Sequence, residues 1–226
     1  MQLFQSLGCL FRCMYSVPWN VYILAGGAEV GSGPLPRLIN QGICFIFPLF
    51  LCIFAGNLIA MMFEIRKATM EDVPVIRDMA SVVFPDTYRE ILSPEQIDYM
   101  MDWMYSEASL RKQMMEEGHI YYLAYHEGRA VGYLSIQPEG EHVFHLQKLY
   151  VLPLFQGKHL GKLLFEQAIK VIKELHPDPC QMRLNVNRNN KALAFYMKMG
   201  MKEIDEGDFP IGNDYYMNDY IMGIDI

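Results

Sequence analysis

The chain lacks the patterns that build disulfide-rich domains and metal centres. It has five cysteines in 226 residues, and four of them lie in the first 60 residues, which leaves Cys180 alone in the rest: Cys9, Cys13, Cys44 and Cys52. Its six histidines are scattered, and no spacing typical of a metal site occurs. These absences exclude a disulfide framework, and we expect a reduced, cytoplasmic protein without a metal.

Ionisable side chains are almost missing from the first 60 residues, which carry only Arg12, Glu29 and Arg37. The rest of the chain therefore holds 17 basic and 25 acidic residues. This acidic balance predicts no nucleic-acid partner and would attract a cationic small molecule. We divide the chain into a hydrophobic extension, residues 1–61, and a domain, residues 62–226.

The apolar part of the extension, residues 42–60, is about as long as a membrane-spanning helix. One interpretation is a membrane anchor, and only then would the protein contact a membrane. A signal peptide fits less well, because the apolar part comes late and no clear cleavage site follows. The third interpretation, which we favour, is that translation begins at Met61 or Met62, where "MMFEIRKATMEDV" has the character of an ordinary cytosolic start.

Beyond residue 61, strand and helix patterns alternate. Apolar alternation predicts strands at 63–67, 120–136 (a hairpin turning at Glu127-Gly128), 143–151 and 181–186, and two more that end at 224. Helical spacing predicts helices after Thr69, over 93–106, 108–117 and 160–175, and over 190–199. The pattern therefore predicts an α/β domain with a mixed, largely antiparallel sheet flanked by helices.

Two of these helices begin with capping signals. Thr69 is followed three residues later by Asp72, and Ser93 by Gln96, with Pro94 at the first helical position. Both spacings predict a capping box, in which the two side chains bond to each other's backbone N–H groups.

The stretch "LPLFQGKHLGKLL", residues 152–164, joins the strand 143–151 to the helix that begins at Leu160. A glycine loop between a strand and a helix directs free backbone N–H groups at the helix N-terminus, where negative charge is favoured. The loop could therefore hold a phosphate, or it could be a simple turn. It lacks the Gly-Lys-Ser/Thr ending of a P-loop and the glycine spacing of a dinucleotide fold.

A second pattern follows in "NVNRNNKALAFYMKMGM", residues 185–201. On a helix, Asn189, Ala192 and Tyr196 share one stripe, and the small alanine would let a ligand approach the backbone. The alternative is an ordinary amphipathic helix with a capping asparagine and a partly buried tyrosine.

Together, "QGKHLG" and "NNKALAFYMKMGM" resemble the acetyl-CoA signature of the GNAT superfamily of N-acetyltransferases, Gln/Arg-x-x-Gly-x-Gly/Ala followed by Asn-x-x-Ala-x-x-Phe-Tyr. The resemblance spans residues 63–226. The stretches "ILSPEQIDYMMDWMYS" and "GNDYYMNDYIM" are similar to the bacterial branch of diamine and spermidine/spermine acetyltransferases. The resemblance implies a GNAT-like fold, acetyl-CoA as co-substrate and a small amine, such as a polyamine, as acceptor. It is also compatible with a homodimer.

By this resemblance, the strand 143–151 and the loop after it bind acetyl-CoA, and Asn189 bonds to its pantetheine. The implied cofactor-binding residues are Leu149, Tyr150, Val151, Gln156, Gly157, Lys158, His159, Leu160, Gly161, Lys162 and Asn189. Two residues are implied in catalysis: the Leu149 N–H would stabilise the oxyanion, and Tyr196 would protonate the departing thiolate. A non-catalytic acetyl-CoA sensor on the same fold is the alternative function.

The general base stays open. Gln147 occupies the strand position where some relatives carry glutamate, and an amide cannot take a proton. His145 on the same strand, or a water chain to a carboxylate, could serve. Tyr88, Tyr99 and Trp103 lie where the family places the acceptor site, and they could equally belong to the core.

His159 departs from the family pattern, because it stands where the loop has its middle glycine. We expect a histidine to fit only if the backbone angle there is an ordinary one and the side chain points away. The loop N–H groups would then survive, and His159 would have no chemical role.

Overall fold

The computed structural model describes residues 62–226, and the predicted anchor or misassigned start lies outside the described residues. This part of the chain contains seven strands: β1 (Glu64–Lys67), β2 (Ile120–His126), β3 (Arg129–Pro138), β4 (Val143–Val151), β5 (Gln181–Asn187), β6 (Lys202–Gly212) and β7 (Tyr215–Asp225). The helices are α3 (Val73–Tyr88), α4 (Pro94–Tyr105), α5 (Glu107–Met115), α6 (Leu160–Leu175) and α7 (Leu193–Lys198), with 3₁₀ turns at Met70–Asp72 and Pro153–Phe155. None of the helices within 62–226 combines the length and apolarity needed to cross a bilayer.

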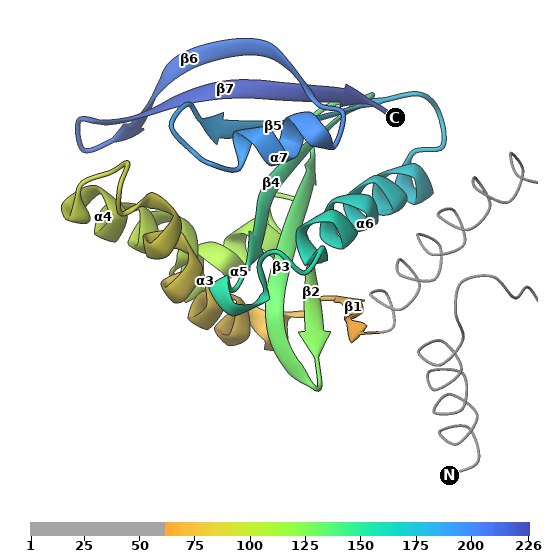
Figure 1. The fold of residues 1–226 in the computed structure, drawn as a ribbon, viewed down its shortest axis with the longest axis horizontal. Helices are drawn as coiled ribbons and strands as arrows, with labels where there is room; N and C mark the ends of the chain where they lie inside the picture. Colours follow the sequence, from red (N-terminus) through yellow and green to blue (C-terminus); the bar gives the residue numbers. More distant parts are fainter. Residues whose placement is uncertain (1–61) are drawn as a thin grey trace, which may run out of the picture. The chain divides into compact units, whose positions relative to one another are not determined.

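The strands form one sheet in the order β1-β2-β3-β4-β5-β7-β6. Every neighbouring pair is antiparallel except β4 and β5, which run parallel. Helix α6 covers one face of the β2–β4 part, and α3 to α5 lie on the other face (Figure 1). The predicted α/β fold with a mixed, largely antiparallel sheet is confirmed.

Each face of the sheet has its own apolar cluster, because successive strand residues point to opposite sides. The α6-side cluster contains Leu164 and Phe165 from the helix and Leu146 and Val151 from β4. The opposite cluster, the α3–α5-side cluster, contains Phe84 from α3. Burying each large apolar side chain contributes roughly 1.5–3 kcal/mol, so the two clusters hold the helices to the sheet.

Two tight turns mark where strands end and the next strands begin. Glu127 and Gly128 have φ angles of 50° and 76°, the left-handed pair of a two-residue hairpin turn. Asn213 and Asp214, with φ angles of 56° and 60°, form a similar turn between β6 and β7.

One of the two predicted capping boxes forms. Thr69 and Asp72 cap each other as expected, through the Thr69 N–H donating to Asp72 Oδ2 at 2.8 Å. Ser93 Oγ accepts from Gln96 N at 3.2 Å. The expected return bond, from the Ser93 N–H to the Gln96 side chain, does not form, so this prediction is wrong. Gln96 Nε2 instead donates to the carbonyl oxygen of Tyr216 at 3.0 Å, because β7 offers the buried amide a backbone acceptor.

Candidate functional site

The site begins where β4 and β5 separate. The two strands pair only over Val143–His145 and Gln181–Arg183, and no pairing follows toward their C-terminal ends. Gln147 is the extra residue of a β-bulge opposite Ser135 and Ile136 of β3. A bulge bends the strand that carries it. Beyond the paired segment, a cavity of about 990 Å³ is lined by both strands, by the loop before α6 and by the ends of α3 and α4.

The unpaired edge of β4 offers backbone groups to this cavity. Leu152 N donates to Val131 O at 2.9 Å, so Leu152 is turned toward β3. In an antiparallel ladder the residues alternate between bonding to the neighbour and turning away. Leu149 and Val151 therefore direct their N–H groups to the side where β5 has left the sheet. Gln156 Nε2 donates to the Val151 carbonyl oxygen at 3.2 Å and does not involve the N–H groups of this edge. Because β5 does not pair with β4 here, the Leu149 and Val151 N–H groups can bond to an extended ligand.

The loop before α6 presents a row of backbone donors. Among the described residues, no acceptor is found for the N–H groups of residues 157–162, whereas Leu163 N donates to His159 O at 3.1 Å. Six free N–H groups at the start of a sixteen-residue helix form a site suited to an anion such as phosphate. Lys158 and Leu160 do not line the cavity: the Lys158 ammonium lies 4.9 Å from the Phe155 ring centroid, and the Leu160 side chain is buried in the core.

The expectation of an ordinary backbone angle at His159 is wrong. His159 is left-handed, with φ 62° and ψ 5°, so it adopts the conformation that glycine would take at little cost. The loop geometry is thus the one a glycine would give, and the strain is carried by the histidine. Its side chain lies at the exposed rim of the cavity.

The second motif is only partly helical. Helix α7 begins at Leu193, so Asn189 and Ala192 precede it, and the predicted helical start at 190 is wrong. Two asparagine side chains explain the difference, because Asn187 Oδ1 accepts from Asn189 N at 3.0 Å and Asn190 Oδ1 accepts from Ala192 N at 2.9 Å. Such turns compete with helix formation.

Asn189, Ala192 and Tyr196 nevertheless all line the cavity. Tyr196 is 9% exposed, and burial raises the pKa of its phenol, so the hydroxyl stays protonated at neutral pH.

The aromatic residues considered for the acceptor side separate into two groups. Tyr88 and Trp103 line the cavity. Tyr99 does not, because its hydroxyl donates to Ile211 O at 2.7 Å and thereby ties α4 to β6.

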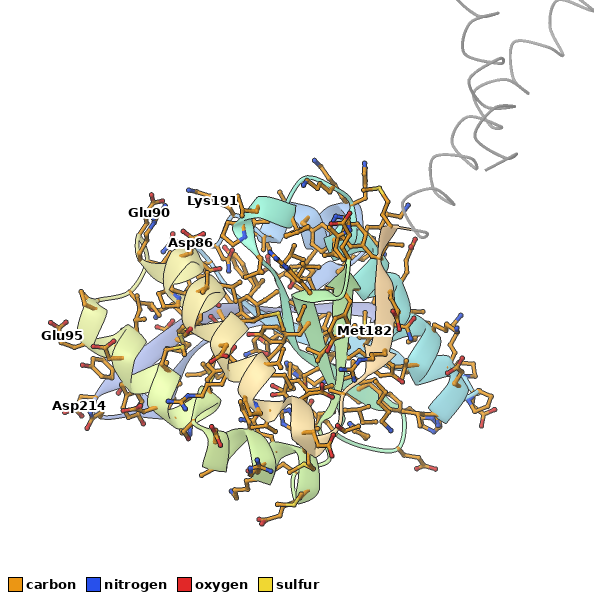
Figure 2. The ribbon with its side chains drawn as sticks, turned by 90° about the horizontal axis from the view of Figure 1, so that it is seen from below. Asp86, Glu90, Glu95, Met182, Lys191 and Asp214 are labelled. Carbon is orange, nitrogen blue, oxygen red and sulfur yellow. The ribbon has the colours of Figure 1, made fainter. Side chains whose placement is uncertain are left out.

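At one end of the cavity, Glu90 and Lys191 join two of its walls. Lys191 Nζ lies 3.0 Å from Glu90 Oε2, and both side chains are exposed near Asp86 (Figure 2). The pair connects the segment after α3 to the turn before α7. Because both groups are well solvated, the pair contributes little to stability.

His145 is not positioned as a base. It does not line the cavity, and its Nδ1 lies 3.2 Å from Glu139 Oε1 on the connection between β3 and β4. Gln147 lines the cavity, but its amide donates to Gln137 Oε1 at 2.8 Å.

The structure brings two buried ionisable groups to the cavity that were not predicted. Asp219 of β7 is 5% exposed, and burial raises the pKa of its carboxyl to about 6. Lys148 of β4 is 7% exposed, and burial lowers the pKa of its ammonium to about 7. The sequence did carry a signal for Asp219, because a charged residue at an inward-facing strand position is unusual. Asp219 lies two residues after Met217 and therefore on the same face of β7, and Met217 belongs to the α3–α5-side cluster. Within residues 62–226 no cluster of side chains suited to a metal occurs.

Comparisons with known proteins agree with this geometry. A family model described as an acetyltransferase (GNAT) domain matches residues 89–209. The chain is 28% identical to the spermidine N(1)-acetyltransferase of Thermoplasma acidophilum over 162 residues, which cover 69% of this chain and 99% of the relative. It is 27% identical over 154 residues to an uncharacterized N-acetyltransferase of Mycobacterium bovis, covering 68% of this chain and 97% of the relative.

A solved structure shares the fold. The PaiA N-acetyltransferase of Thermoplasma acidophilum in complex with coenzyme A superposes with a TM-score of 0.61 at 25% identity, covering 73% of this chain and 99% of that one.

Proposed function

The chain belongs to the acetyltransferase (GNAT) family with acetyl-CoA as co-substrate, and we propose that it transfers the acetyl group directly to a primary amine within a ternary complex. We assign this activity to residues 62–226. The observation that carries the proposal is the β4 edge and the free N–H groups of residues 157–162, which open into one cavity.

We propose that the two features bind different parts of acetyl-CoA. The edge at Leu149–Val151 would pair with the amides of the pantetheine arm as an added strand does. The N–H groups of residues 157–162 would bind the pyrophosphate, with the nearby Lys162 adding positive charge. Asn189 also lines the cavity and would bond to the pantetheine.

Two groups would act on the reacting thioester. The Leu149 N–H, which is turned toward the cavity, would donate to the thioester oxygen as negative charge develops there. Tyr196 would donate its proton to the sulfur as CoA leaves, because its phenol is protonated and lies in a buried position. Holding the amine and the thioester in line supplies much of the remaining rate gain.

For the acceptor we propose a cationic amine such as a polyamine. The Thermoplasma relative is named for spermidine, and the net charge of this chain is −7. We also propose that the protein works in the cytoplasm, because Cys180 is a buried free thiol.

The proposal is tested with purified full-length protein, acetyl-CoA and a panel of amines, with detection of the free thiol released. We expect thiol release that depends on the amine, with spermidine among the acceptors. Binding of acetyl-CoA without thiol release for every amine would contradict the proposal and would indicate a sensor. A second preparation that begins at Met62 tests whether residues 1–61 are needed.

A further inference from the structure

The carboxylate of Asp219 is directed to the acceptor side of the sheet. In β7, Tyr220 and Met222 pack with the α6-side cluster, whereas Met217 packs with the α3–α5-side cluster. Because strand residues alternate, Asp219 shares the face of Met217. It also lines the cavity, which on this face is walled by Tyr88 and Trp103.

Among the described residues, no basic side chain forms an ion pair with this carboxylate. Asp219 Oδ1 is buried and makes no hydrogen bond there. Burial raises the pKa of this carboxyl, whereas a hydrogen bond from the Asn185 side chain of β5 and the charge of Arg188, from the segment after β5, lower it. Tyr88 faces it from the end of α3. A buried carboxylate without a cation is costly, by several kcal/mol, so its retention needs a reason.

Arg188 acts on Asp219 through its charge but forms its ion pairs with other carboxylates. Its Nε lies 3.2 Å from Glu206 Oε2, and its Nη1 lies 3.1 Å from Asp208 Oδ1, both on β6. Arg188 also does not line the cavity. The open partner of Asp219 is therefore a ligand in the cavity, and a carboxylate there is complementary to an ammonium group.

Resting on the proposed function, we propose that Asp219 is the base that takes the proton from the ammonium group of the acceptor amine. The N–H bond of the ammonium breaks and an O–H bond forms on Asp219. The freed lone pair forms the C–N bond, the C–S bond breaks, and Tyr196 gives its proton to the sulfur. After the attack the nitrogen still carries two protons, and one of them passes to the Tyr196 phenolate to leave the neutral amide. Asp219 releases its proton to water, so one proton is released per turnover.

The environment of Asp219 suits this role. With a pKa of about 6, the carboxylate is ionised at pH 7 and is a stronger base than an ordinary aspartate. Lys148 also lines the cavity, but its Nζ is held by Gln113 Oε1 at 2.8 Å and lies between two tyrosine rings. Lys148 is the other candidate for the base, and the experiment must distinguish it from Asp219.

The test compares full-length wild type, Asp219→Asn and Asp225→Asn. Asp225 is an exposed carboxylate at the end of the same strand and does not line the cavity, so it is the matched control. Each protein is assayed from pH 5.5 to 9 with spermidine, propylamine and trifluoroethylamine, whose amino group is already largely neutral at pH 7. Acetyl-CoA affinity and urea unfolding are measured alongside.

We expect Asp219→Asn to lower kcat/KM for spermidine and propylamine at pH 7 by ~10²–10⁴-fold, the usual range for a positioned base. The acidic limb near pH 6 should vanish, and the rate should rise about tenfold per pH unit as free amine becomes available. The loss should be much smaller with trifluoroethylamine. Acetyl-CoA affinity and the Asp225→Asn enzyme should match wild type, and Asp219→Asn should be at least as stable as wild type in urea, because the change removes a buried charge.

Three outcomes would overturn the assignment. An unchanged rate and pH limb in Asp219→Asn would locate the base elsewhere, with Lys148 next to be tested. An equal loss for all three amines, together with weaker acetyl-CoA binding or lower stability, would make Asp219 structural. A wild-type protein that acetylates no amine would refute the proposed function and the role of Asp219 with it, and this result is distinct from the first two.

Discussion

Replacing Lys148 by methionine should raise the free energy of unfolding at pH 7 by several kcal/mol. The Lys148 side chain is 7% exposed, and burial lowers the pKa of its ammonium from 10.5 to about 7. Each tenfold loss of proton affinity corresponds to about 1.4 kcal/mol. Below pH 7 the lysine therefore destabilises the folded state by on the order of 5 kcal/mol, a large part of the stability of a typical domain.

The pH dependence has a definite sign. Between pH 7 and 10.5 the unfolded chain holds a proton on Lys148 that the folded protein does not, so the stability of the wild type rises with pH. The advantage of Lys148→Met should therefore shrink by about 1.4 kcal/mol per pH unit above 7. Glu117, whose charge favours the protonated lysine, is the one group that opposes the effect of burial.

Methionine suits this position because few polar contacts are lost. Lys148 Nζ donates to Gln113 Oε1, and that oxygen keeps a second donor, the Tyr121 hydroxyl at 2.6 Å. The aliphatic stem packs near Tyr105 and Tyr121, and methionine keeps a similar length and flexibility there.

The measurement is urea unfolding of wild type and Lys148→Met from pH 7 to 9.5, because the difference between the two cancels most other titrations. His119 is the exception, since burial and Lys148 lower its pKa to about 4, so the range stays above pH 7. A stability difference that does not change with pH would refute the reasoning. It would mean that the folded protein keeps Lys148 charged.

Three further changes test the site and the core. Tyr196→Phe should lower kcat by ~10²–10⁴-fold while acetyl-CoA affinity changes little, as measured by thiol release and calorimetry; full kcat would return Tyr196 to a packing role. His159→Gly should keep turnover and acetyl-CoA binding and leave stability equal or raised by up to about 1 kcal/mol, because it relieves a left-handed backbone; lost turnover with intact binding would give His159 a chemical role. Gly132→Ala should destabilise by ~1–3 kcal/mol in urea unfolding, because its Cβ would meet Tyr150 O at 2.9 Å and Leu164 Cδ1 at 3.2 Å; an unchanged midpoint would show that β3 can move away from β4.

Much of the fold could be predicted because its signals are local. The turn at Glu127-Gly128 marks the hairpin, and the apolar spacing after Leu160 marks α6. The start of α7 could not be predicted by periodicity, since Asn187 and Asn190 hold the preceding turns through side-chain oxygens. Local signals therefore predict elements well and predict their ends less well where side chains compete with the backbone.

The candidate site was predictable only where its residues are adjacent in sequence. The loop 156–162 is one such segment, and the structure places its N–H groups together. Asp219 is different, because it reaches the cavity only through the pairing of β7 with β5, in which it lies opposite Asn187. That register brings together segments about 30 residues apart, and no sequence motif predicts it. The one sequence signal for Asp219 was a charged residue at an inward-facing position of a strand.

The bulge at Gln147 connects these findings. Before it, Phe144 and Leu146 face the α6-side cluster, and after it Leu149 and Val151 face the same cluster. Without the extra residue the alternation would continue unshifted, and Lys148 would point into the α6-side core. One inserted residue therefore keeps both halves of β4 in phase with the core. It lies just beyond the last residues that pair with β5, where the edge that carries Leu149 meets the cavity. Because the bulge shifts the alternation by one residue, it also sets the side to which Leu149 directs its N–H group, on which the proposed chemistry depends.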